Sequence, residues 1–116
     1  MPTPAKREFE EHLALLHAAI DTLRAELLNF KKATGSARTL VDRGTDMVDA
    51  LACVQGPQLR QDLADALRDF EAQRHRARLA IIALAREQGA SISEVGRQLG
   101  ISRQLAYRLA AEEEAG

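Results

Sequence analysis

Two short amphipathic segments around a central glycine, within residues 91–110, constrain the fold of this chain more than any other stretch. Ser91 stands three residues before Glu94, the spacing at which each side chain can bond the other residue's backbone amide at a helix start. We expect a short helix over residues 92–99. Gly100 should end it, because glycine adopts the left-handed conformation of a tight helix end without a side-chain clash.

A second short helix is expected to begin at Ser102, which is a good N-cap residue. The apolar residues of the two helices fall on an inner face: Ile92, Val95, Leu99, Ile101, Leu105 and Leu109, with the small Ala106 where the helices approach. The outer face carries Ser102, Arg103, Gln104, Tyr107 and Arg108. Arginine can form two hydrogen bonds with the edge of a guanine, and glutamine can do the same with an adenine. Hydroxyl groups can reach phosphates. A helix N-terminus also attracts phosphate.

The pattern Ser-x-x-Glu-Val-Gly-Arg-x-Leu-Gly-Ile-Ser-Arg-x-x-Ala-Tyr-Arg-Leu resembles the helix-turn-helix of many bacterial regulators and of resolvase/invertase C-terminal domains. The resemblance implies that the second helix enters the DNA major groove, with base contacts from its first residues. The implied contacts are Ser102, Arg103, Gln104, Tyr107 and Arg108, and we add Arg97 and Ser91 as candidates. Gly96 departs from the family, which usually has alanine at the helix crossing. The alternative is two packed helices with a polar exterior.

Charge is distributed unevenly along the chain, although its net value is only -1. Residues 1–71 hold nine Lys/Arg and twelve Asp/Glu, whereas residues 72–111 hold seven arginines and two glutamates. A basic segment is what attraction to phosphate requires. Arg76 and Arg78, together with Arg74, are therefore candidate phosphate contacts, and a solvated helix face is the alternative for them.

The predicted fold class is all-α, because aromatic residues make up only 3% of the chain and the β-branched runs of a sheet are absent. A long N-terminal helix should carry a heptad seam, which we assign to dimerisation: Phe9, Leu13, Leu16, Ile20, Leu23, Leu27 and Phe30. Its partner is either a second copy, giving a coiled coil, or later helices of the same chain, giving a bundle. We expect a dimer whose bundle uses both.

The bounds of the remaining helices are predicted from the segments that contain glycine or proline between them. Residues 34–36 should end the first helix, and a second helix is expected over residues 38–55, with Gly44 on its apolar face and Cys53 as a small core residue. Gly56-Pro57 should start a third helix that continues to Gln88. Its last part would be the first helix of a three-helix, DNA-binding unit.

These elements divide the chain into three expected parts. Residues 1–73 form a helical dimerisation region, residues 74–111 the helix-turn-helix domain, and residues 112–116 an acidic tail that frays into solvent. The lone cysteine excludes an intramolecular disulfide. No metal site, cofactor, small-molecule ligand or catalytic pair is expected, so we predict that the chain is not an enzyme.

The sequence thus predicts a homodimeric, sequence-specific protein that binds double-stranded DNA, of the bacterial transcriptional regulator type. One alternative is a DNA-architectural or segregation factor that binds many sites. Another is a helical adaptor whose seam binds a different protein. With no apolar run long enough to span a membrane and no evident secretion signal, we expect a cytoplasmic, nucleoid-associated protein without membrane contact.

Overall fold

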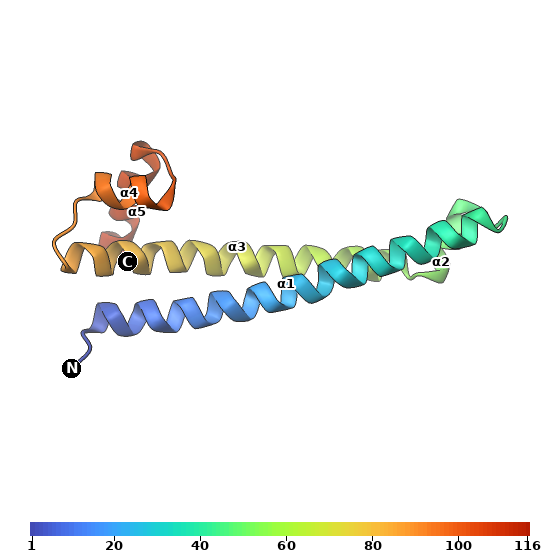
Figure 1. The fold of residues 1–116 in the computed structure, drawn as a ribbon, viewed down its shortest axis with the longest axis horizontal. Helices are drawn as coiled ribbons and strands as arrows, with labels where there is room; N and C mark the ends of the chain where they lie inside the picture. Colours follow the sequence, from blue (N-terminus) through green and yellow to red (C-terminus); the bar gives the residue numbers. More distant parts are fainter. The chain divides into compact units, whose positions relative to one another are not determined.

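The computed structural model describes all residues 1–116 and contains five helices and no strand. The helices are α1 (Pro4–Asp42), α2 (Met47–Cys53), α3 (Gly56–Glu87), α4 (Ile92–Leu99) and α5 (Arg103–Ala115). The predicted all-α class, with long N-terminal helices and a C-terminal helix-turn-helix, is confirmed (Figure 1). The chain forms two compact units: residues 18–71, and residues 1–17 together with 72–116.

Helix α1 continues through Thr34-Gly35-Ser36, so the prediction that it ends there is wrong. The hydroxyl of Thr34 donates to the Phe30 carbonyl at 2.9 Å, and that of Ser36 donates to the Lys32 carbonyl at 3.1 Å. These hydroxyls are thereby satisfied within the helix and do not compete for the backbone amides of a turn. Gly35 lowers helix stability by only about 1 kcal/mol relative to alanine, which is too little to end a helix of this length.

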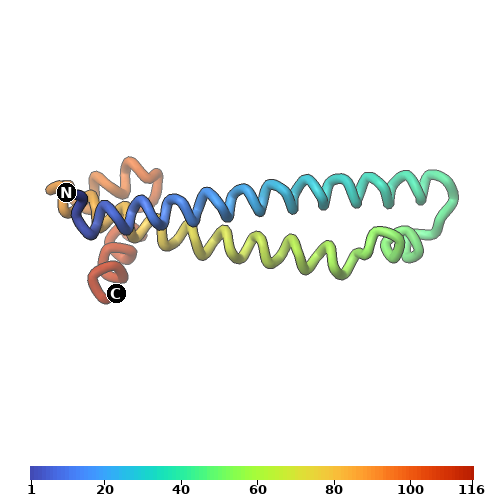
Figure 2. Tube along the Cα trace, turned by 90° about the horizontal axis from the view of Figure 1, so that it is seen from below, coloured from blue at the N-terminus to red at the C-terminus, as the bar shows by residue number.

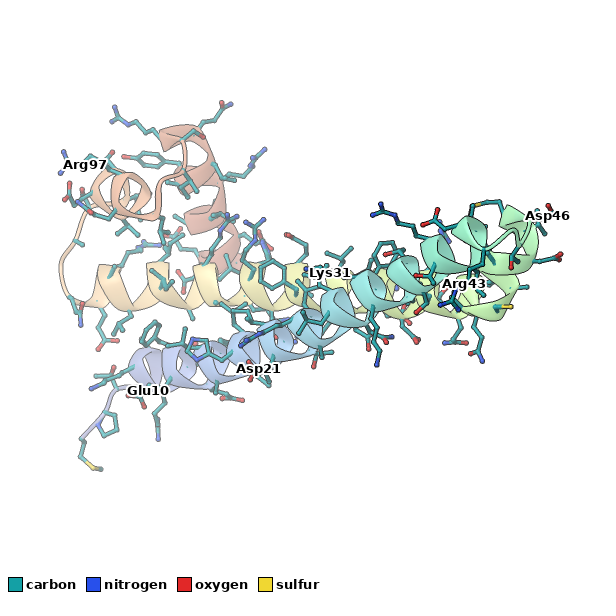
Figure 3. All side chains as sticks on the ribbon, turned by 45° about the vertical axis from the view of Figure 1, so that its right-hand side comes forward. Glu10, Asp21, Lys31, Arg43, Asp46 and Arg97 are labelled. Carbon is teal, nitrogen blue, oxygen red and sulfur yellow. The ribbon has the colours of Figure 1, made fainter.

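The end of α1 lies instead at Gly44, which has a φ of +101°. The Gly44 amide donates to the Val41 carbonyl at 3.0 Å, and the Thr45 amide donates to the Leu40 carbonyl at 2.9 Å. This is the Schellman pattern, which uses a left-handed glycine just beyond the last helical residue. The expected helix over 38–55, with Gly44 on its apolar face, is therefore wrong. Arg43 and Asp46 flank the resulting turn (Figure 3).

In the unit of residues 18–71, α1 and the first part of α3 run antiparallel, and α2 lies at the turn between them (Figure 2). Its fully buried residues are all alanines: Ala19, Ala37, Ala50 and Ala66. The larger seam residues Ile20, Leu27 and Phe30 remain exposed, whereas Leu23 is half-buried. Cys53 is exposed in the last turn of α2, so its expected place in the core is wrong.

Helix α3 is continuous, as the absence of breakers after Pro57 predicts. It ends at Gly89, whose φ is +89°, with the Gly89 amide donating to the Arg86 carbonyl at 3.0 Å. The Ala90 amide donates to the Ala85 carbonyl at 2.9 Å, which completes a second Schellman end.

In the unit of residues 1–17 and 72–116, α4 and α5 pack on the C-terminal part of α3 around a shared apolar core (Figure 1). Ile82 of α3, with 1% of its surface exposed, is the largest fully buried side chain of the whole chain. It is joined in the core by Val95 of α4 and by Leu109 and Ala110 of α5. The predicted three-helix unit is therefore built by residues from all three helices.

The C-terminal glutamates are helical and paired, so the expectation of a fraying tail is wrong. The Glu112 carboxylate lies 2.7 Å from the His75 Nε2 atom. Arg86 pairs with Glu113 at 3.5 Å and also with Glu114. These contacts attach the end of α5 to α3. They join residues that are far apart in the sequence, so the composition of the C-terminal segment does not indicate them.

No helix is both long and apolar enough to cross a membrane. The chain also lacks a group of three or more histidine, cysteine or acidic side chains arranged to hold a metal ion.

Candidate nucleic-acid interface

The α4–turn–α5 segment is held by side-chain caps at both helix starts. The Ser91 hydroxyl accepts from the Glu94 amide at 3.2 Å, and the Ser102 hydroxyl accepts from the Leu105 amide at 3.0 Å. Both N-caps are as predicted. The reciprocal bond of a capping box is replaced, because the Glu94 carboxylate accepts from Arg97 and Gln98 instead.

The turn between the two helices is formed by Gly100, whose φ is +72°. The Gly100 amide donates to the Arg97 carbonyl at 3.2 Å, and the Ile101 amide donates to the Gly96 carbonyl at 3.1 Å. This third Schellman end confirms the predicted glycine stop.

Gly96 lies where α4 and α5 cross. A Cβ atom added there would meet the Ala106 Cβ atom at 2.6 Å, closer than real Cβ atoms approach. Both residues are buried. The glycine that departs from the usual alanine is thus required by this crossing, since Ala106 occupies the space that a methyl group would need.

The outer face of α5 carries the predicted contact residues. Ser102, Arg103, Gln104, Tyr107 and Arg108 are all exposed. The opposite face of the same helix is buried or half-buried through Leu105, Ala106, Leu109 and Ala110. Helix α5 and its N-cap Ser102 therefore present these five polar side chains together, with the apolar core on the opposite side of the helix.

Tyr107 has two partners on this face. Its hydroxyl lies 3.4 Å from the Ser93 hydroxyl of α4, and the Arg103 guanidinium carbon lies 5.8 Å from its ring centroid. The hydrogen bond with Ser93, and to a smaller extent Arg103, lowers the pKa of the Tyr107 hydroxyl. Ser93 is not recognisable as a site residue from the sequence, because only the packing of α4 against α5 brings it to Tyr107.

The candidates on α4 have partners within their own helix. Arg97 points away from α3 (Figure 3) and pairs with Glu94. This bond lowers the pKa of the Glu94 carboxyl and raises that of the Arg97 guanidinium. Ser91 is exposed, but its hydroxyl oxygen already caps the helix.

The candidates on α3 are not part of the α5 face. Arg76 lines a pocket of about 470 Å³ together with the carboxylates of Glu8, Glu112 and Glu113, which would repel phosphate. Arg78 is half-buried on α3, and Arg74 is half-buried with a partner of its own. The structure therefore gathers the predicted contact residues of α5 on one face of that helix, whereas Arg76 of α3 lies among acidic side chains.

A match to a known family agrees with this geometry. Residues 72–116 match the family described as Homeodomain-like domain. This segment is a helix-turn-helix DNA-binding domain. The matched segment contains the C-terminal part of α3, all of α4 and all of α5. No curated protein and no solved structure matches the chain.

Proposed function

We propose that this protein is a sequence-specific DNA-binding transcriptional regulator that acts as a homodimer. The observation that carries the proposal is the exposed face of α5, on which five predicted contact residues stand together in a helix-turn-helix domain. In such domains the second helix lies in the major groove, with its N-terminal residues on base edges.

The side chains of α5 are assigned roles by their chemistry. Arg103, in the first turn, is proposed to bind a guanine edge and Gln104 an adenine edge. Ser102 and Arg108 would bind phosphates on either side of the groove, which positions the helix without reading sequence. The N-terminal end of α5 adds a favourable partial positive charge for phosphate.

Homodimer formation is supported by the composition of the unit of residues 18–71. Its buried positions are alanines, whereas Ile20, Leu27, Leu28 and Leu67 keep two-fifths or more of their surface exposed. An apolar groove of about 550 Å³ adjoins several of these residues and is lined also by Leu23 and Phe70. Pairing of two such hairpins would bury these large side chains in a four-helix bundle.

A dimer also fits the requirements of a small DNA-binding domain. Two helix-turn-helix domains related by symmetry bind two half-sites about 34 Å apart, or multiples of this spacing, on an inverted repeat. We therefore propose that residues 74–111 contact DNA and that dimerisation lies within residues 1–73.

The test is sequencing of genomic DNA fragments retained by the purified full-length chain. It is compared with the Arg103→Ala/Arg108→Ala variant and with Arg43→Ala/Arg68→Ala, which removes equal charge from exposed positions outside the helix-turn-helix domain. We expect discrete inverted repeats with the wild type and the control, and their loss in the first variant.

Other outcomes would overturn the proposal. Diffuse retention at many unrelated sites, together with open self-association, would indicate an architectural DNA-binding protein instead. No retention by any of the three proteins would exclude DNA binding.

A further inference from the structure

The contact between Ser93, Tyr107 and Arg103 joins α4 to the exposed face of α5. Tyr107 is 49% exposed, yet its hydroxyl and its ring each have a partner. Ser93 comes from the first turn of α4, whereas Arg103 and Tyr107 lie four residues apart, one turn of α5. The contact therefore runs from one helix, through an aromatic ring, to an arginine in the first turn of the other.

This arrangement restrains a side chain that is otherwise flexible. A free arginine loses much conformational entropy when it is fixed on a base. A guanidinium group within about 6 Å of an aromatic ring centroid is attracted to the ring face. The ring can orient Arg103 only if it is itself held, and the hydrogen bond to Ser93 holds it.

The same geometry changes the role expected for Tyr107. From its residue type and its place on the outer face, the Tyr107 hydroxyl is expected to reach a phosphate, like the other hydroxyls there. In the structure that hydroxyl already has a partner, 3.4 Å away on α4. Its ring lies beneath Arg103, which places it where it supports the neighbouring contact.

We propose that Ser93 is a positioning residue that holds Tyr107, and through it Arg103, in the orientation that sets the base preference of α5. This inference rests on the proposed function. It adds a specificity-determining residue on α4, outside the helix that enters the groove. Neither Ser93 nor the ring of Tyr107 needs to touch a base for this role.

The proposal can be tested directly because Tyr107 is the chain's single tyrosine and there is no tryptophan. The ultraviolet absorbance of phenolate therefore reports Tyr107 alone, in the absence of DNA. The hydrogen bond from Ser93 stabilises the phenolate, so Ser93→Ala should raise the pKa of Tyr107 toward its ordinary value. Ser93→Thr keeps a hydroxyl and should retain the low pKa, and Arg103→Ala should also raise it.

A matched control is available in the other unit. Ser36→Ala removes an exposed serine hydroxyl that bonds the Lys32 carbonyl in α1, and it should leave the Tyr107 titration unchanged. Circular dichroism at the pH of each titration verifies that every variant remains folded.

The second measurement is base preference, determined by selection from a randomised duplex library. The position read by Arg103 is the one at which preference disappears in Arg103→Ala, a loss of roughly 5- to 150-fold in discrimination for a bidentate contact. Ser93→Ala and Tyr107→Phe should each lose several-fold discrimination at this position and little affinity for unrelated DNA. Their double variant should lose no more than either single variant.

Several results would overturn the inference. An unchanged Tyr107 titration in Ser93→Ala would show that Ser93 does not hold the ring. A raised pKa with unaltered base preference would limit the contact to a structural role. Equal loss on all sequences in Tyr107→Phe would make Tyr107 a phosphate contact. Failure of the wild type to bind DNA would instead reject the proposed function, and the titration would separate that outcome from a missing Ser93 contact.

Discussion

At the scale of single residues, the crossing of α4 and α5 depends on the absence of one methyl group. The Cβ atom of Ala106 occupies the space beside Gly96, so the two backbones approach as closely as they do only with glycine in α4. A glycine within a helix usually weakens it by about 1 kcal/mol relative to alanine. Here that cost is offset by the close approach that it allows between the helices.

We predict that Gly96→Ala lowers the free energy of unfolding by up to about 2 kcal/mol, because overpacking costs about 1–3 kcal/mol and the helix-propensity gain recovers about 1 kcal/mol. Urea denaturation followed by circular dichroism measures this change. The double variant Gly96→Ala/Ala106→Gly moves the methyl group to the other helix and should return stability close to that of the wild type. Additive losses in the double variant would contradict the steric explanation.

Glu94 is expected to titrate below the ordinary range of a glutamate, because Arg97 and Gln98 both donate to its carboxylate. A folded pKa lower than the unfolded one stabilises the domain above the unfolded pKa. This contribution is lost as the pH falls through the folded value. NMR titration of the Glu94 side-chain carbonyl should show the low pKa, and Arg97→Ala should raise it more than Gln98→Ala. An unchanged titration in Arg97→Ala would mean that the pair does not persist in solution.

At the scale of the helix, two glycines, one within α1 and one just beyond its end, have opposite roles. Gly35 lies inside α1 with open space where a Cβ atom would be, and Gly44 ends the helix with a left-handed φ of +101°. The difference between them is conformational, since neither position is crowded.

We therefore predict changes of opposite sign on substitution by alanine. Gly35→Ala should raise the free energy of unfolding by up to about 1 kcal/mol through helix propensity. Gly44→Ala should lower it by about 1–2 kcal/mol, because an L-residue is strained in the left-handed conformation. Thermal and urea denaturation of the two variants measure both effects. A stabilising Gly44→Ala would show that α1 does not end where the structure places its terminus.

At the scale of the whole molecule, the two compact units differ in how they bury apolar residues. The helix-turn-helix unit has a core that includes Ile82, Val95 and Leu109. The unit of residues 18–71 buries only alanines and leaves its large side chains partly exposed. This contrast is the reason for assigning self-association to the second unit.

Leu28 is the most exposed large apolar residue of α1, with 59% of its surface accessible. Completing its burial in a dimer would contribute about 1–2 kcal/mol per chain, so Leu28→Ala should weaken a symmetric dimer by roughly 30- to 1000-fold. Analytical ultracentrifugation over a concentration series measures the dissociation constant. Asn29→Ala, at the adjacent exposed position, is the control and should have little effect. Equal behaviour of both variants would move the interface elsewhere.

Much of the fold was predictable because its signals are local. Serine caps, glycine stops and the spacing of apolar residues act within a few positions along the chain, and they located α4, α5 and the long α3. They also placed the polar residues of α5 on one face. The sequence shows that Gly96 replaces the alanine usual in such domains. It does not show the reason, which is the proximity of the Ala106 Cβ atom.

The remaining features depend on residues that are distant in sequence. Thr34-Gly35-Ser36 has the composition of a turn, yet hydroxyl bonds to preceding carbonyls keep it helical, and α1 ends at Gly44 instead. The glutamates at the end of α5 are ordered by His75 and Arg86, more than 25 residues earlier.

The helical class, the helix-turn-helix and the face that α5 exposes are thus predictable from local sequence, because backbone caps and amphipathic periodicity depend on neighbouring residues. Which surfaces meet is instead a property of the folded chain: the close approach of α5 at Gly96, the burial of alanines in residues 18–71, and the bond between Ser93 and Tyr107. Each depends on the distance between two helices, and that distance follows from the packing of all their side chains at once.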